Sequence, residues 1–177
     1  MKPLYITAFL TLYCTFLFGQ SSNEFFNHLK SFKGKTIYGK AIYMPDTTKA
    51  NDFWGKELSF TVLQFKRSEL RLPFNAGENK TRTWILKKSR HGIQLKHDHR
   101  HADGSQDSIT NYGGDSDISL GTTLSQYFPA DAFTAKLLPS ASTNRWIMEF
   151  SADKKRFYYI LERNKSLRFK AEFYLEN

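Results

Sequence analysis

Cysteine is nearly absent from this chain of 177 residues, which contains a single one, Cys14. One thiol cannot form an intramolecular disulfide or supply a cysteine-based zinc site, so disulfide-rich and zinc-ribbon classes are excluded. Glycine and proline are also scarce, with ten and five residues, which excludes a collagen-like chain. At this length we expect a single domain.

The first 19 residues have the features of a secretory signal peptide. Lys2 supplies a positive start, an apolar run extends from Leu4 to Phe18, and Gly19 is a small residue at the exit. The run is shorter than the roughly 20 apolar residues that span a bilayer. We therefore expect residues 1–19 to be removed by cleavage after Gly19, and no membrane span in the mature chain.

A lipoprotein signal at Cys14 is the weaker interpretation, because the bulky Tyr13 stands where a small residue is required and Cys14 lies inside the apolar run. Cleavage leaves residues 20–177 as one cysteine-free domain. The prediction is an exported protein, periplasmic or secreted, whose stability does not depend on disulfides.

Aromatic residues and positive charge are what the sequence has in excess. Aromatics make up 16%, with 16 Phe and 9 Tyr, and favour β structure. With 40% hydrophobic and 24% charged residues, neither a disordered chain nor a polytopic membrane protein is expected. The net charge of +9 is spread along the chain, as on a solvated surface. An anionic envelope partner stays open, whereas export argues against nucleic acid.

One short helix is predicted at the start of the mature domain. Ser21-Ser22-Asn23-Glu24 has the Ser-x-x-Glu spacing of a capping box. Aromatic and aliphatic residues then recur at helical spacing up to Gly34, which predicts the helix end. We expect this apolar stripe to pack on the core; its residues are Phe25, Phe26, Leu29 and Phe32.

The remainder of the chain is predicted to form about eight to ten strands joined mostly by short turns. No βαβ alternation occurs, so the sheet should be antiparallel. An up-and-down barrel, calycin-like, would hide its edges by closing and could hold one small ligand; a β-sandwich is the alternative. The predicted strands are Thr36–Met44, Glu57–Lys66, Glu69–Phe74, Thr81–Lys88, one from Ile93, Thr122–Phe128 and three more between residues 146 and 175.

Four of the five histidines lie between residues 91 and 101. If the strand from Ile93 continues, Leu95, His97, His99 and His101 share its inner face, because side chains alternate along a strand. The strand would then lead from a packed floor to an imidazole-lined mouth. The predicted ligand contacts are His97, His99 and His101 together with Trp84, Arg82 and Tyr112.

A divalent metal is one alternative for this strand. His-x-His on a strand places two imidazoles on one side, which suits zinc, copper, nickel or iron once a third ligand is added. Asp103 is the predicted third ligand, with Asp107 and His28 as alternatives. The competing interpretation is a metal-free polar network of inward histidines.

Two acidic segments have simpler structural interpretations. Asp103-Gly104 is typical of a turn capped by aspartate, and Asp131 is expected to cap a turn or short helix. Asp115-x-Asp117, after Gly113-Gly114, is a loop of oxygen ligands that suggests calcium, but its spacing does not fit the twelve-residue calcium loop. The sequence also lacks a Gly-x-Ser-x-Gly elbow, His-Glu-x-x-His, a phosphate loop and a dinucleotide fingerprint.

Several motifs together resemble a family of small exported bacterial proteins of unknown function. They are Arg82-Thr83-Trp84, the block from Leu95 to His101, Tyr112-Gly113-Gly114 and Phe128-Pro129-Ala130-Asp131. The resemblance implies bacterial export and brings no activity. A helix followed by a strand series is also similar to calycin barrels such as lipocalins, although Lys35 and Thr36 stand where those proteins carry the Gly-x-Trp motif.

The leading hypothesis is an exported barrel, without an assigned catalytic activity, that binds a small apolar or amphipathic ligand. The alternatives are a metal-binding protein or metal-dependent enzyme that uses His97 and His99, and a structural or interaction module of the cell envelope. The oligomeric state is not predicted.

Overall fold

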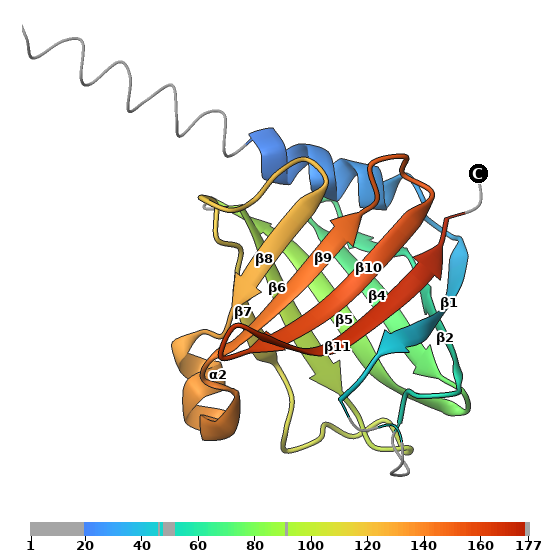
Figure 1. Ribbon diagram of the computed structural model, residues 1–177, viewed down its shortest axis with the longest axis vertical. Helices are drawn as coiled ribbons and strands as arrows, with labels where there is room; N and C mark the ends of the chain where they lie inside the picture. The colour runs from blue at the N-terminus through green and yellow to red at the C-terminus, as the bar shows by residue number, and fades with distance from the viewer. Residues whose placement is uncertain (1–19, 46, 48–51, 91, 176–177) are drawn as a thin grey trace, which may run out of the picture.

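The computed structural model describes residues 20–45, 47, 52–90 and 92–175. The predicted signal peptide, Cys14 and His91 lie outside these ranges. Within them, ten antiparallel strands follow one path of neighbours, β7-β6-β5-β4-β2-β1-β11-β10-β9-β8, and an eleventh, β3, pairs with β4 (Figure 1). This sheet is nearly closed into a barrel, which confirms the prediction of an antiparallel barrel rather than a two-sheet sandwich.

The predicted strands over residues 36–44, 69–74 and 81–88 match observed strands to within two residues at each end. Most neighbours on the path are consecutive strands; the exceptions are β4–β2 and β1–β11, and β7 and β8 are the two ends of the path. The strands are β1 (Thr36–Tyr43), β2 (Glu57–Thr61), β3 (Leu63–Lys66), β4 (Glu69–Ala76), β5 (Asn79–Ser89), β6 (Gly92–His99), β7 (Tyr112–Asp115), β8 (Ser125–Pro129), β9 (Asn144–Phe150), β10 (Arg156–Arg163) and β11 (Ser166–Tyr174).

The predicted single strand over residues 57–66 is wrong, because it is divided at Val62. The Val62 N–H donates to the carbonyl of Lys35, and its own carbonyl accepts from Gly34. Val62 therefore pairs with the link between the N-terminal helix and β1, next to the Thr36–Thr61 pair. Its side chain is buried in the core, and β3 beyond it pairs with β4, as β2 does.

The sequence prediction assigns Gly113 and Gly114 to a loop and therefore misses strand β7. Both glycines lie at the seam where β7 meets β8. A Cβ on Gly113 would lie 2.0 Å from the carbonyl oxygen of Leu95, and one on Gly114 would lie 1.9 Å from that of Pro129. Since such contacts are impossible, only glycine allows β7 this close to both neighbours.

Two backbone hydrogen bonds join the β7 and β8 sides of this seam. The Asp131 N–H donates to Gly113 at 2.9 Å, and the Asp117 N–H donates to Tyr127 at 2.7 Å. Between them the Thr134 hydroxyl, from the short helix α2 (Ala132–Leu137), accepts from the Gly113 N–H and donates to its carbonyl. The seam is therefore closed by a helix side chain as well as by the backbone.

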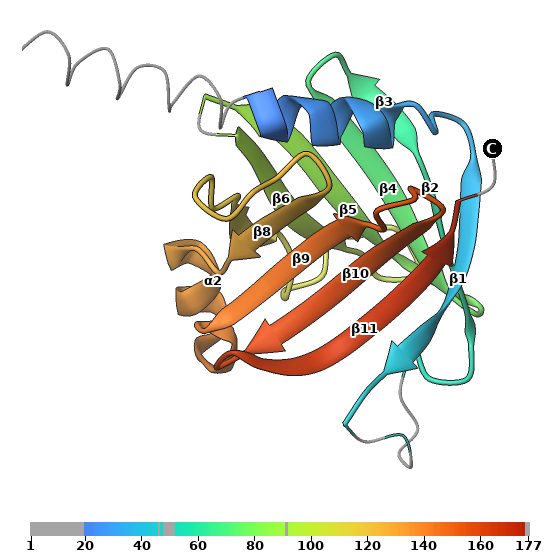
Figure 2. The same cartoon turned by 45° about the horizontal axis from the view of Figure 1, so that its top comes forward.

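A helix over residues 20–30 lies across one end of the barrel (Figure 2). As predicted, its apolar stripe is buried: Phe25, Phe26 and Leu29 are fully covered. The Phe25 ring lies 5.2 Å from that of Phe150 at the end of β9. Burying such a ring contributes about 1.5–3 kcal/mol, so the helix closes this end of the core.

The predicted capping box is wrong, because residues 21 and 22 already lie inside the helix. Glu24 accepts instead from the Gln20 side chain one turn earlier. The Ser22 hydroxyl donates to Gln126 on β8 at 3.0 Å. The polar residues at this position therefore attach the helix to the barrel.

Aromatic rings fill the middle of the barrel. Phe60 lies 4.9 Å from Phe173 and 5.3 Å from Phe157, and Phe150 lies 5.1 Å from Phe157. Tilted and edge-to-face pairs at these distances each add about 0.5–1.5 kcal/mol beyond burial. This layer separates the end covered by the helix from the other end, where the site lies.

Candidate functional site

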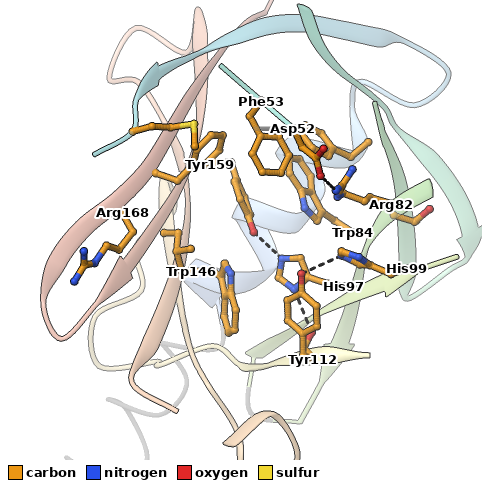
Figure 3. Close-up of a pocket in the computed structure, with 15 residues that line it drawn as sticks. Asp52, Phe53, Arg82, Trp84, His97, His99, Tyr112, Trp146, Tyr159 and Arg168 are labelled. Atoms are coloured by element: carbon orange, nitrogen blue, oxygen red, sulfur yellow. Dashed lines mark hydrogen bonds and ion pairs between the residues drawn. The ribbon is translucent and has the colours of Figure 1, made fainter. Parts of the chain in front are cut away.

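A cavity of about 340 Å³ lies inside the barrel, at the end away from the N-terminal helix (Figure 3). The direction of β9 shows this, because Phe150 at its end contacts the helix whereas Trp146 near its start lines the cavity. Five of the six predicted ligand contacts line it: Arg82, Trp84, His97, His99 and Tyr112.

One wall of the cavity comes from the register of three neighbouring strands. Trp84 on β5 lies directly opposite His97 on β6, and His97 lies opposite Tyr112 on β7. One step toward the open end, Arg82 lies opposite His99. The alternation predicted for β6 is confirmed, since Ile93, Leu95 and His97 are buried.

The opposite wall comes from β9, β10 and β11, which the ligand-contact prediction missed. It includes Trp146, Tyr159, Leu161 and Phe169. Trp146 and Tyr159 are buried on β9 and β10 and line the cavity. No local signal showed that these strands lie across the barrel from the histidine strand, because that relationship depends on closure.

His97 is the most fully enclosed polar group of the site, with 3% of its surface exposed. Its Nδ1 lies 3.1 Å from the backbone carbonyl oxygen of Tyr112, and its Nε2 lies 2.6 Å from the hydroxyl of Tyr159. A carbonyl only accepts, so Nδ1 carries the proton and donates to it. Nε2 therefore accepts the proton of the Tyr159 hydroxyl.

Burial keeps His97 neutral. Desolvation, with small further effects of His99 and Lys96, lowers the pKa of His97 to about 3 against the raising effect of its bond to Tyr112. Burial also raises the pKa of Tyr159 well above its usual value. At neutral pH this pair is an uncharged donor and acceptor, and its geometry fixes the imidazole in one tautomer.

Aromatic rings form two separate stacks within the site. Trp84 is stacked between Phe74, at 4.6 Å and 19°, and Tyr159, at 4.3 Å and 20°. The ring of His97 stacks on Tyr112 at 4.6 Å and 12°. These stacks hold the rings in place, so the cavity has preformed aromatic walls.

His99 lies nearer the open end, where it joins Tyr112. The Tyr112 hydroxyl is 3.0 Å from His99 Nε2, and the His99 backbone N–H donates to Thr110. Burial, followed by the positive charge of Arg82, lowers the pKa of His99. Burial raises the pKa of Tyr112 to about 12, so this pair is also neutral at pH 7.

Arg82 is the less exposed of the two arginines that line the cavity. Its Nη2 donates to the carboxylate of Asp52, and its guanidinium carbon lies 5.3 Å from the centroid of the Phe53 ring. The Arg82 side chain is 16% exposed and that of Asp52 is 51% exposed, so the pair spans the cavity mouth. The Nη1 of Arg82 is buried and has no hydrogen-bond partner within the described residues.

The predicted place of His101 in this site is wrong. Strand β6 ends at His99, and the chain turns so that the His101 N–H donates to Ser105 and its carbonyl accepts from Gly104. His101 is exposed and does not line the cavity. The turn is the one predicted at Asp103-Gly104, with the Asp103 carboxylate accepting from the Ser105 N–H and hydroxyl.

This turn also separates the predicted metal ligands, because Asp103 is exposed and bonded to Ser105. Of the two predicted alternatives, Asp107 accepts from the Ile109 N–H, and His28 belongs to the N-terminal helix and packs against Phe150. Among the residues that the structure describes, no three His, Cys, Asp or Glu side chains form a group that could hold a metal ion. The set of His97, His99 and Asp103 is therefore not assembled.

The two aspartates of the suggested calcium loop accept hydrogen bonds from different parts of the structure. Asp115 belongs to β7 and accepts from the Gln94 side chain, whereas Asp117 accepts from the Ser119 N–H and hydroxyl. Asp131 is the N-cap of α2, as predicted, and accepts from the Thr134 N–H at 2.8 Å. It also forms an ion pair with Lys96.

Comparisons with known proteins leave the chain without an assigned relative. It matches no protein-family model, no curated protein and no solved structure. The resemblance to small exported bacterial proteins and to calycin barrels therefore stays a prediction. None of the helices within the described ranges has the length and apolar character that crossing a membrane requires.

Proposed function

We propose that this protein is an exported barrel that binds one small apolar or amphipathic molecule in its cavity. The observation that carries the proposal is the cavity itself, at about 340 Å³. Ligand pockets in proteins range from about 300 to 1,000 Å³ and combine apolar walls with a few fixed polar groups. Export rests on the signal-like sequence of residues 1–19.

The composition of the walls favours an apolar ligand body. Trp84, Trp146 and Phe169 face the cavity from opposite sides. The deepest polar atoms, on His97 and Tyr159, already bond each other. The part of a ligand that reaches this depth therefore contacts aromatic rings. The unpaired Nη1 of Arg82 lies nearer the mouth of the cavity.

Two alternatives have less support. A metal-dependent role needs a third ligand beside His97 and His99, and none is assembled within the described residues. A purely structural module would be expected to fill its interior, but this barrel keeps an open space beside stacked rings. The proposal assigns no reaction to the site.

Titration with N-phenyl-1-naphthylamine, a neutral apolar fluorophore, tests the proposal. We expect saturable binding of one molecule per chain. Fluorescence energy transfer from Trp84 and Trp146 to the bound fluorophore should report it. Leu161→Trp would fill the cavity and abolish binding, whereas Leu120→Trp, at an exposed position, would preserve it. Equal binding by both variants, or no saturable binding by the native protein, would contradict the proposal.

A further inference from the structure

We propose that the ligand carries a carboxylate, and that this group binds Nη1 of Arg82 at the cavity mouth. This inference rests on the proposed function and specifies the polar end of its ligand. The observation behind it is that Arg82, a residue of the cavity lining, carries a buried nitrogen without a hydrogen-bond partner among the described residues. A buried N–H without an acceptor is costly, and more so when the group is charged.

The position of Arg82 explains why a ligand would supply the missing acceptor. Asp52 occupies Nη2, and the Phe53 ring lies beside the guanidinium. His99, directly opposite on β6, already meets the Tyr112 hydroxyl. Because these neighbouring groups are already engaged, we infer that a ligand in the cavity supplies the acceptor oxygen for Nη1.

The charge of the site favours an anion over a neutral acceptor. The charged side chains that line the cavity are Arg82, Arg168 and Asp52, two positive and one negative. Asp52 is half exposed, so solvent screens its charge more than that of Arg82. The neighbouring histidine and tyrosine side chains are neutral at pH 7, for the reasons given above.

The number of free donors favours a carboxylate over a phosphate ester. Nη1 is one nitrogen whose two N–H groups diverge, so it offers a carboxylate oxygen one well-directed, charge-assisted hydrogen bond. A phosphate ester brings up to two charges and three acceptor oxygens, and Arg168, the other guanidinium of the lining, is exposed. Together with the aromatic walls, this describes an amphipathic monocarboxylate, with either an alkyl or an aryl body.

Matched pairs of acids and alcohols test the inference by isothermal titration calorimetry on the native protein. Decanoate and decanol share an alkyl body, and 4-tert-butylbenzoate and 4-tert-butylbenzyl alcohol share an aryl body. We expect the acid of at least one pair to bind about 10- to 100-fold more tightly than its alcohol, as for a hydrogen bond to a charged group. The pair with the larger preference identifies the kind of body.

Two variants then test whether the preference for the acid over the alcohol depends on Arg82. Arg82→Gln should remove it, whereas Asp52→Asn should increase it, because the amide removes the negative charge that competes with the ligand for Arg82. Arg156→Gln, on the outer face of β10 beside Tyr174, is the matched control and should retain it. The Asp52→Asn result stands independently if Arg82→Gln does not fold.

The outcomes separate the two proposals. Equal affinity for acid and alcohol in both pairs, or a preference that persists in Arg82→Gln, would overturn the carboxylate inference and leave the binding function intact. If no member of either pair binds and the fluorophore does not bind either, both proposals fail together.

Discussion

The imidazole of His97 and the phenol of Tyr159 meet inside the barrel, with 2.6 Å between Nε2 and the hydroxyl oxygen. The two residues are 62 positions apart in the sequence and come from β6 and β10, on opposite walls. Because the Tyr112 carbonyl fixes the proton on Nδ1, the bond to Tyr159 has a defined direction. It is a polar link between the two halves of the cavity.

Tyr159→Phe should lower the free energy of unfolding by about 1–3 kcal/mol. The substitution keeps the ring that stacks on Trp84, but it leaves Nε2 of His97 buried without a donor. Tyr38→Phe is the matched control, because Tyr38 is 53% exposed and surface changes usually stay within about 0.5 kcal/mol. Urea unfolding of both variants measures the difference, and equal losses would contradict the role assigned to the hydroxyl.

Stability should decrease as pH falls below about 6.5, the usual pKa of histidine in an unfolded chain. The folded pKa of His97 is about 3, so protonation favours the unfolded state. The contribution of this neutral imidazole is fully present above pH 6.5 and is lost progressively as pH falls toward 3. The lowered pKa values of His28 and His99 act in the same direction.

His97→Asn isolates the contribution of His97 to this pH dependence. The amide can still donate to the Tyr112 carbonyl but does not titrate. We expect the variant to be less stable at pH 7.5 and to depend less on pH between 6.5 and 4.5, by up to about 1.4 kcal/mol per pH unit. Urea unfolding across this range measures both slopes, and parallel slopes would show that His97 is not the group responsible.

Gly114→Ala should open the barrel seam. A Cβ there would lie 1.9 Å from the Pro129 carbonyl oxygen, so β7 and β8 must separate. We expect a loss of about 1–3 kcal/mol or more, as for overpacking, and faster amide exchange at Asp117 and Asp131. Asp115→Ala, the exposed neighbour in β7, is the control. Unchanged exchange at the seam would show that closure does not depend on Gly114.

Asp131→Ala should destabilise the protein by about 1 kcal/mol, the usual cost of losing an N-cap. Asp131→Asn keeps an acceptor for the Thr134 N–H but loses the ion pair with Lys96. Since partly exposed ion pairs contribute little, this variant should retain most of the stability. Thermal unfolding of both variants distinguishes the two contributions, and equal losses would assign the effect to the charge instead.

Much of the cavity lining could be predicted from one strand. The alternation of Ile93, Leu95 and His97 placed His99 on the inner face, and β6 has this arrangement. His101 could not be assigned correctly, because the alternating pattern of the sequence extends beyond His99, where β6 ends, into the turn at Asp103-Gly104. Periodicity predicts which face a residue takes only where the strand persists.

The sequence by itself determined the class of fold and the faces of its strands. Period-two alternation requires a sheet with one buried side, and the absence of βαβ units requires antiparallel pairing. Only the tertiary structure decided that Tyr159 would face His97 and that Arg82 would keep an unsatisfied nitrogen. Both depend on which strands lie across the barrel from each other, and closure fixes this through contacts far apart in the chain.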